Sequence, residues 1–450
     1  MKPARTLQKK VHLVSLGCAR NLVDSEVMLG SLFKNGWKHT AEPGSADAVI
    51  INTCGFIQSA KEESIDTILS MAELKKTKPD MKLVVTGCLS QRYKKQLATG
   101  LPEVDFFLGT DQFTDIDTYL FSPPEKGTVI AKRTHALYNE ELARVNTLSP
   151  FSAYVKVAEG CQHNCSFCII PAIRGRLRSR TISSVVKEVT DLVNQGVKEV
   201  VLIAQDLAAF GRDRDKDELV ELLKALAAVD GLQWIRQLYM YPENISDELL
   251  DLMAGEQKIV KYLDVPVQHA SDKILKKMNR ILSREEMTNV FRRVRQKVPE
   301  IAIRTTIMVG FPGESDEDFA LLRDFVKEMR FEHLGCFSYS QEEGTVAGRM
   351  QEQVPDEIKE ARLAEIMEVQ QKISREKLQT HVGKTYPVLI TGTDPENEAR
   401  LLGRLATQAP DVDGLVYIED GDALISGDVV PVRITEAFEY DLKGQARKGV

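Results

Sequence analysis

The sequence feature that most constrains the fold is a cysteine placed directly after each of three apolar segments. Cys18 follows VHLVSLG, Cys54 follows AVIINT and Cys88 follows LVVTG. Short apolar runs of this kind are typical of buried strands, and the stretches between them have helical spacing. Strands that alternate with helices form a parallel sheet. Because the carboxyl ends of such strands share one edge, the three thiols can converge on one site.

Region 1–122 is therefore predicted to be a parallel α/β domain. Its strands are expected at 10–16, 47–52, 81–86 and 104–108, and its helices at 23–33, 59–74 and 91–97. The alternative for the cysteines is three unrelated core thiols, since free cysteine is among the most buried residue types. Their identical position after three consecutive strands favours a shared metal site.

A second group of three cysteines is close together in the sequence. Cys161, Cys165 and Cys168 stand in AEGCQHNCSFCIIPAIRG with C-x3-C-x2-C spacing. Structural zinc sites take four ligands, and the nearby His163 lies inside the triplet, where a tetrahedron would be strained. Three thiolates instead suit a 4Fe–4S cluster with one open iron that can bind a substrate.

From residue 151 a second alternation of strands and helices begins. Strands are expected at 153–158, 199–204, 234–239, 262–267, 303–309 and 334–339. Six β–α units are too few for a closed eight-unit barrel, so we expect an open partial (β/α)6 barrel. With a connector helix at 357–379, this domain covers 151–379. Residues 123–150 are expected to be a linker that contains a hairpin.

Residues that follow the other barrel strands are candidates for a cofactor pocket, because chemistry in such barrels lies at the carboxyl ends of the strands. The candidates are Gln205, Asp206, Gly310, Gly313 and Glu314. The two glycines of GFPGE would let the backbone approach a ligand closely. The alternative for this segment is an ordinary β–α turn.

Three further residues are candidates for contact with a substrate. Arg174 and Arg176 belong to RGRLRSR, the main local basic cluster, and His269 follows the fourth barrel strand. The alternatives are a solvated face paired with carboxylates for the arginines and a buried, hydrogen-bonded side chain for the histidine. Cys336 stands alone inside an apolar segment and is interpreted as a core thiol.

The composition changes again at residue 380. Region 380–450 is rich in glycine and β-branched residues without helical period, which is typical of a small all-β barrel. Within 381–450, three Lys and four Arg stand against seven Asp and five Glu, a net charge of −5. Nucleic-acid-binding modules neutralise phosphates with Lys and Arg. An acidic barrel is therefore expected to suit a basic protein, and no sequence-specific nucleic acid binding is expected.

The compartment follows from what the sequence lacks. No run of about 18 apolar residues is present, so no membrane span is expected, and the basic N-terminus has no signal-peptide pattern. The seven cysteines are an odd number in a chain without an export signal. Disulfides are not expected in such a protein, and we predict a cytoplasmic location.

Taken together, the motifs resemble the methylthiotransferase family of radical S-adenosylmethionine (SAM) enzymes. GC-x2-N at 17–21, NTC at 52–54 and TGC at 86–88 precede the C-x3-C-x2-C triplet, and the last domain is similar to the family's TRAM domain. The resemblance implies two 4Fe–4S clusters, one on each cysteine group, and two uses of SAM, as methyl donor and as radical source. A radical is needed because base chemistry cannot open an unactivated C–H bond.

Within that family the chain is similar to the ribosomal-protein (RimO-type) branch. CSFCIIPAIRGRLRSR, AQDLAAFGRD and YLDVPVQHASDKILKKMNR carry the likeness, with Phe210 where the branch has tyrosine. The resemblance implies methylthiolation of an aspartate β-carbon in small-subunit ribosomal protein twelve, with an electron donor and a sulfur source as partners. The alternatives are a tRNA adenosine methylthiotransferase and a non-catalytic zinc or iron–sulfur protein. Seven cysteines cannot ligate two clusters fully, which would take eight.

Overall fold

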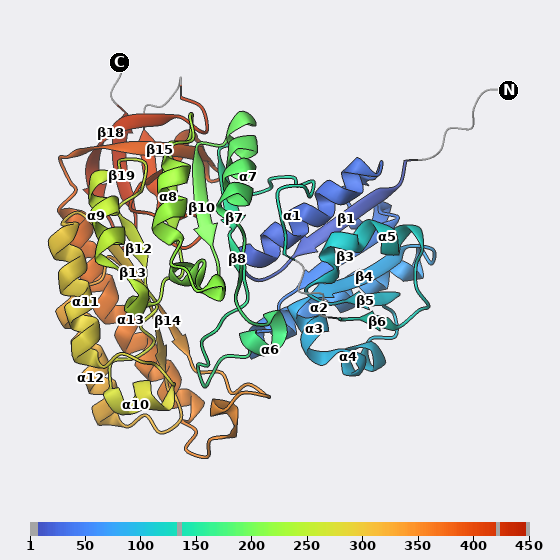
Figure 1. Cartoon of the computed structure of the whole chain (residues 1–450), viewed down its shortest axis with the longest axis horizontal. Coiled ribbons are helices and arrows are strands. Elements are labelled where there is room, and N and C mark those ends of the chain that lie inside the picture. The colour runs from blue at the N-terminus through green and yellow to red at the C-terminus, as the bar shows by residue number, and fades with distance from the viewer. Residues whose placement is uncertain (1–7, 133–136, 420–423, 447–450) are drawn as a thin grey trace.

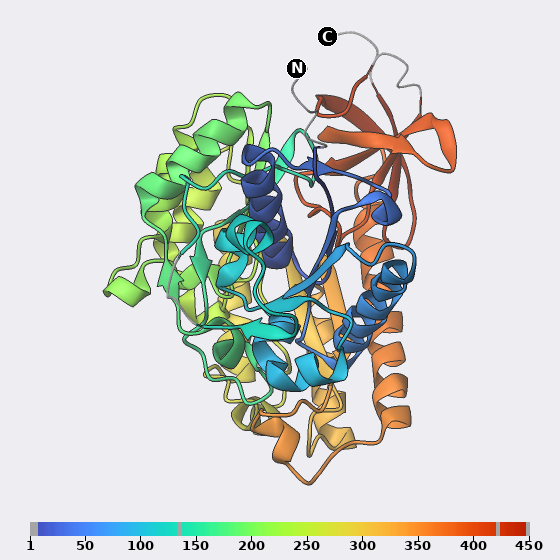
Figure 2. The same cartoon turned by 90° about the vertical axis from the view of Figure 1, so that its right-hand side faces the viewer.

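The computed structural model describes residues 8–132, 137–419 and 424–446, which form three domains in chain order (Figure 1). The N-terminal α/β domain, drawn in blue, lies in front of the partial barrel in Figure 2. The small C-terminal barrel, drawn in red, covers one end of the partial barrel in Figure 1. The expected fold class is confirmed for all three domains.

The N-terminal domain contains a six-stranded parallel sheet in the order β2-β1-β3-β4-β5-β6. The strands are β1 (Lys10–Ser15), β2 (Lys38–His39), β3 (Ala48–Thr53), β4 (Lys82–Gly87), β5 (Phe106–Leu108) and β6 (Thr128–Ile130). The helices are α1 (Ala19–Lys34), α2 (Gln58–Glu73), α3 (Cys88–Tyr93), α4 (Lys95–Gly100) and α5 (Ile116–Phe121). All six residues of β3 are buried, as expected for a central strand with helices on both faces.

Two short strands of this sheet were not expected from the sequence. The edge strand β2 has two residues, and β6 lies within 123–150, where we predicted a linker with a hairpin. β6 instead pairs in parallel with β5, so the hairpin prediction is wrong for the described part of this segment. The sheet therefore continues past residue 122.

The central domain is the expected open barrel of six parallel strands. They are β7 (Ser152–Lys156), β10 (Glu199–Ile203), β11 (Trp234–Gln237), β12 (Tyr262–Asp264), β13 (Ala302–Val309) and β14 (His333–Ser338). A parallel bridge between Ile235 and Ile259 joins the two three-stranded halves. A short antiparallel pair, β8 (Ala158–Glu159) and β9 (Arg178–Ser179), flanks helix α6 (Ile170–Arg174).

Helices surround this barrel. They are α7 (Ile182–Asn194), α8 (Leu219–Ala227), α9 (Asp247–Gly255), α10 (Asp272–Lys277), α11 (Arg284–Lys297), α12 (Asp316–Met329) and α13 (Asp356–Gln379). Capping boxes start α11, from Ser283 with Glu286, and α12, from Ser315 with Asp318. No described helix is both long and apolar enough to cross a membrane.

The C-terminal domain is a closed barrel that covers the amino ends of the central strands. Its strands are β15 (Thr385–Asp394), β16 (Asn397–Leu405), β17 (Val416–Glu419), β18 (Val429–Ala437) and β19 (Leu442–Ala446). The β16–β17 loop reaches the central domain, where the Tyr262 hydroxyl donates to Asp413 Oδ2 at 2.7 Å. A buried ion pair between Arg404 and Glu199, at 2.5 Å, adds to this contact.

These contacts reduce the number of acidic residues of the C-terminal barrel that could face a basic partner. Asp411 and Asp413 face the central domain, where they accept hydrogen bonds from Tyr154 and Tyr262. The Asp413 carboxylate is buried in this contact and is not available to a partner, whereas Asp411 stays exposed. Four other charged residues of the count, Asp420, Asp422, Arg447 and Lys448, lie outside the described residues.

Candidate metal centres

The structure brings the first three cysteines together at the carboxyl edge of the N-terminal sheet. Cys18 caps the start of α1, Cys54 follows β3 and Cys88 opens α3 directly after β4. Burial, helped by the nearby Cys18 and Cys54 thiols and opposed by Arg174, raises the pKa of Cys88 to about 11. Gly17 has φ +88°, and a Cβ there would lie 2.8 Å from Cys54 Cβ. Only glycine lets two of these cysteines approach so closely.

The asparagines of the GC-x2-N and NTC motifs hold the cysteine loops in place. Asn21 Nδ2 donates to Leu16 O at 2.9 Å and to Thr53 O at 3.0 Å, so it ties together the two segments that precede Cys18 and Cys54. Asn52 Nδ2 donates to Asn21 O at 2.8 Å. Both asparagines are buried, and their hydrogen bonds satisfy carbonyls that the turns would otherwise leave unpaired.

The electrostatics of Cys18 differ from those of its two neighbours. Burial alone would raise the pKa of this thiol, but the Arg20 and Arg174 guanidinium groups and two backbone N–H groups outweigh that effect. The pKa of Cys18 therefore lies below its ordinary value, whereas burial raises the pKa of Cys54. Cations beside a thiol favour the thiolate, which is the form that binds metals.

The second triplet lies in the loop after β8, at the carboxyl end of the central barrel. Cys161 N–H donates to Gly175 O at 3.1 Å, and Cys168 N–H donates to Cys165 O at 3.1 Å. Burial raises the pKa of Cys161 to about 11 and that of Cys168 to about 12. A metal that binds these thiols must therefore displace their protons.

The His163 side chain contacts neighbouring residues and is not placed as a fourth cluster ligand. Its Nε2 lies 2.8 Å from Asp206 Oδ2, and its ring stacks on Tyr241 with centroids 3.7 Å apart. The Tyr241 hydroxyl lies 3.3 Å from Cys165 Sγ, and the Arg280 guanidinium covers the same ring at 4.1 Å. The predicted cofactor residue Asp206 thus positions the wall beside Cys165. Sequence reasoning missed Arg280, which is far from the triplet in the chain.

The GFPGE turn is held by its own packing. Glu314 accepts hydrogen bonds from the backbone N–H groups of Gly310, at 2.8 Å, and Phe311, and it pairs with Arg362 at 2.8 Å. A Cβ on Gly310 would meet the Lys359 side chain at 2.2 Å. This glycine therefore makes room for α13. The Glu314 carboxylate is fully engaged, which agrees with the ordinary-turn alternative.

Two further predicted residues occupy distinct positions. A Cβ on Gly313 would lie 2.1 Å from Lys277 Nζ, so this glycine accommodates α10. Gln205 Nε2 donates to Glu159 at 2.8 Å, while its buried Oε1 has no partner among the described atoms. Of the predicted cofactor residues, Gln205 thus keeps an acceptor that a ligand could use.

His269 is not accessible to a macromolecular substrate. It is completely buried, and its Nδ1 accepts the Ser271 N–H at 2.9 Å. The proton of a neutral ring is therefore on Nε2, which lies 3.3 Å from Glu314 Oε2. This environment matches the alternative of a buried, hydrogen-bonded histidine.

Arg174 also requires a correction. It was predicted to contact substrate, but it is 3% exposed and forms ion pairs with Asp24 at 2.9 Å and Glu159 at 3.0 Å. Its Nη2 lies 3.5 Å from Cys88 Sγ. The Lys156 ammonium group pairs with the same two carboxylates. Arg174 therefore joins the central barrel to the first cysteine site, while its neighbour Arg176 is exposed.

The donor sets fit clusters better than single ions. No three His, Cys, Asp or Glu side chains of the described chain lie close enough together to bind one metal ion. Three thiols around a 4Fe–4S cluster each bind a different iron, so they stay farther apart than the ligands of one ion. Soft thiolates are the ligands that iron–sulfur clusters use. Cys336 belongs to neither group and lies on β14, where burial raises its pKa to about 12.

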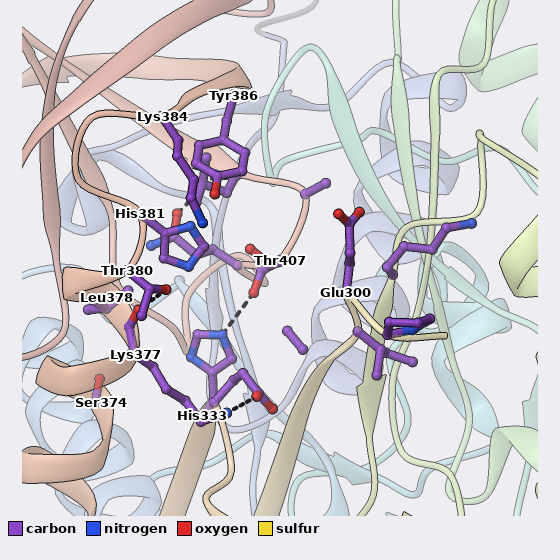
Figure 3. Close-up of a pocket in the computed structure, with 18 of the residues that line it drawn as sticks. Glu300, His333, Ser374, Lys377, Leu378, Thr380, His381, Lys384, Tyr386 and Thr407 are labelled. Atoms are coloured by element: carbon purple, nitrogen blue, oxygen red, sulfur yellow. Dashed lines mark hydrogen bonds and ion pairs between the residues drawn. The ribbon is translucent and has the colours of Figure 1, made fainter. Parts of the chain in front are cut away.

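A cavity of about 490 Å³ lies away from both cysteine groups. It is at the amino ends of β13 and β14, between the central domain and the C-terminal barrel. Figure 3 shows His333, Lys377, His381 and Lys384 around it. His333 Nε2 contacts Thr407 O at 2.8 Å, and Lys377 pairs with Glu332. This cavity is therefore part of the contact between domains and not of the metal sites.

Comparison with known proteins agrees with this architecture. Residues 10–109 match uncharacterized protein family UPF0004, residues 155–326 match the Radical SAM superfamily and residues 382–446 match the TRAM domain. The chain is 47% identical to the ribosomal protein uS12 methylthiotransferase RimO of Bdellovibrio bacteriovorus, over 99% of each chain. It is 46% identical to the protein of the same name from Myxococcus xanthus, over 97% of this chain and 91% of that one.

The chain belongs to the RimO family of methylthiotransferases. It is a radical SAM enzyme and uses SAM and 4Fe–4S clusters. Among solved structures, the radical SAM methyltransferase TsrM of Kitasatospora setae is similar, with a TM-score of 0.54 and 15% identity over 74% of this chain and 72% of that one. The cobalamin-dependent SAM radical enzyme OxsB has a TM-score of 0.53 and 12% identity, over 80% of this chain and 56% of that one. At these identities the likeness shows the fold alone.

Proposed function

We propose that this enzyme adds a methylthio group to the β-carbon of an aspartate in ribosomal protein uS12. One hydrogen atom leaves that carbon, and a sulfur atom that carries a methyl group replaces it. The relatives named uS12 methylthiotransferase support the choice of substrate protein. The observation that carries the proposal is the presence of two separate three-thiol sites on facing domains. A radical SAM enzyme needs one such site, so the second serves a further step.

Each site would be held by its own cysteines. We assign the first cluster to Cys18, Cys54 and Cys88, and the second to Cys161, Cys165 and Cys168. When bound, the second cluster would supply the electron that splits SAM into methionine and a 5′-deoxyadenosyl radical, which can remove hydrogen from an unactivated carbon. Asn21 and Asn52 would fix the first site, and the His163–Tyr241 stack would wall the second.

An apolar contact at helix α6 links the two sites. Cys88 packs in one apolar cluster with Ile169 and Ile173, and Ile169 directly follows Cys168. Substrate chemistry between the sites would be shielded from water by this contact, which matters because radicals react with whatever is near.

The partners follow from the same proposal. Glu396 and Glu398 are exposed at the β15–β16 turn, where an acidic surface suits a basic ribosomal protein. The chemistry also needs a one-electron donor and a sulfur source. An enzyme that acts on the small ribosomal subunit would work in the cytoplasm, where ribosomes are.

The test is a choice between substrates. The protein is reconstituted without oxygen with iron and sulfide, supplied with SAM and a strong reductant, and offered either small ribosomal subunits or bulk tRNA. Mass spectrometry then identifies the product. A methylthio aspartate in uS12 supports the proposal, whereas a methylthio adenosine would assign the enzyme to tRNA.

Two cysteine variants separate the roles of the sites. Cys161→Ala is expected to abolish formation of 5′-deoxyadenosine. Cys54→Ala is expected to retain 5′-deoxyadenosine formation and to lose methylthio transfer. If both variants lose only methylthio transfer, the assignment of SAM cleavage to the second site is wrong.

A further inference from the structure

Arg20 places a positive charge between the two cysteine groups. It stands two residues after Cys18 in the N-terminal domain, yet its Nη1 donates to Ala204 O at 2.7 Å, directly after β10 of the central barrel. Its charge favours the thiolate of Cys18 and also acts on Cys161 and Cys168. The charge of one guanidinium group therefore acts on thiols of both sites.

This arginine has no carboxylate partner among the described residues. It contacts the Ala204 carbonyl and the ring of Tyr239, whose centroid lies 4.7 Å from the guanidinium carbon. Arg174, by contrast, pairs with Asp24 and Glu159. A guanidinium group has five N–H donors, of which the described contacts use one, at Ala204 O. Arg20 is thus suited to receive an anion from outside the chain.

The residue beneath Arg20 has a strained backbone. Tyr239 has φ +63°, a left-handed conformation that bulky residues rarely adopt. Its N–H donates to Asp264 Oδ2 at 3.2 Å and its carbonyl accepts the Leu207 N–H at 2.8 Å. Strain of this kind persists where the surroundings enforce it, commonly at ligand sites. Here it holds the aromatic ring under the guanidinium group at the carboxyl end of the barrel.

We infer that Arg20 binds the side-chain carboxylate of the substrate aspartate. This inference rests on the proposed function and extends it to a specificity-determining residue. The β-carbon to be modified is bonded directly to the carboxyl carbon, so a bidentate pair with Arg20 would fix that carbon between the two sites. An asparagine at the same position would lose the charge and half of the acceptor geometry.

The test measures discrimination between two substrates. Wild-type enzyme and the variants Arg20→Met and Arg20→Lys are each given uS12 with the natural aspartate and uS12 with asparagine in its place. The ratio of kcat/KM for the two substrates is expected to fall at least ~10-fold in Arg20→Met, which corresponds to about 1.4 kcal/mol. Arg20→Lys is expected to retain part of the ratio. Where asparagine uS12 gives no product, its inhibition constant replaces kcat/KM.

Arg280→Met is the matched control. Arg280 also has no carboxylate partner among the residues described, but it contacts Cys165 and Tyr241 at the second site. Its loss is expected to lower the rates for both substrates by the same factor. Iron content is measured for every variant, so that loss of a cluster is not mistaken for loss of recognition.

The outcomes separate the two proposals. If wild-type enzyme does not modify uS12, the proposed function fails. If it does, and the ratio of kcat/KM for the two substrates is unchanged in Arg20→Met, the inference about Arg20 is wrong. Where Arg20→Met loses its iron, Arg20→Lys takes its place, and an unchanged ratio in that variant has the same meaning. The inference is also wrong if Arg280→Met abolishes the discrimination.

Discussion

Replacing Arg174 with methionine should destabilise the joint between the N-terminal domain and the central barrel. The guanidinium group pairs with Asp24 and Glu159, and Lys156 pairs with the same two carboxylates. Two cations thus balance two anions, and all four side chains are buried. Arg174→Met leaves one buried negative charge in excess. Removing one partner of a buried ion pair costs about 3–5 kcal/mol, so we expect a loss of this size in the free energy of unfolding.

The assay is urea denaturation of the apoprotein, followed by tryptophan fluorescence. The two tryptophans report on the two joined domains, Trp37 in the first and Trp234 in the second. Arg176→Met is the matched control, because that neighbouring side chain is exposed and should change stability by less than about 0.5 kcal/mol.

A second substitution tests the cause. Glu159→Gln removes the negative charge that Arg174→Met leaves in excess, so the double variant should recover about 1–3 kcal/mol relative to Arg174→Met alone. Equal stability of Arg174→Met and Arg176→Met would refute the argument. A double variant less stable than Arg174→Met would show that stranded charge is not the cause.

Three other predictions follow from single contacts. Gly17→Ala should lose about half of the bound iron, measured after reconstitution, because its Cβ would collide with Cys54 at the first site only. Cys336→Ala should retain all the iron and the methylthio transfer activity, and lost iron would contradict its place outside both sites. Burial raises the pKa of Glu199, but Arg404 and Arg236 outweigh burial and lower it to about 2 from 4.5. The stability that this carboxylate contributes is therefore complete above about pH 4.5 and lost as pH falls toward 2, so acid unfolding of apoprotein followed by circular dichroism should be less steep in Glu199→Gln.

The cysteine groups could be predicted because their positions depend on local pattern. An apolar strand followed by a cysteine needs no knowledge of the rest of the chain, and parallel strands end at a common edge. The C-x3-C-x2-C spacing is equally local. The short strands β2 and β6 were missed because two or three residues carry no measurable periodicity.

The arginines show where sequence reasoning ends. Arg174 and Arg176 are two positions apart in one basic run, yet one is buried in an ion-pair network and the other is exposed. The difference depends on Asp24, about 150 residues away in the chain, which meets Arg174 only in the folded protein. His163 likewise depends on Asp206 and Tyr241, which come from other strand ends. A run of charged residues predicts that a segment is basic, but only the fold decides which of its side chains are buried and which are exposed.

The arrangement of the two cysteine groups has a consequence for how the enzyme is built. The groups lie on different domains, and a reaction that uses both requires a constant separation between them. Asn21 contacts Arg174, which contacts Cys88, while Arg20 spans from Cys18 to Ala204. Two arginines, Arg20 on α1 and Arg174 on α6, therefore join the first site to the barrel. Since buried ion pairs contribute more to specificity of arrangement than to net stability in some proteins, we interpret this network as the device that sets the distance between the sites.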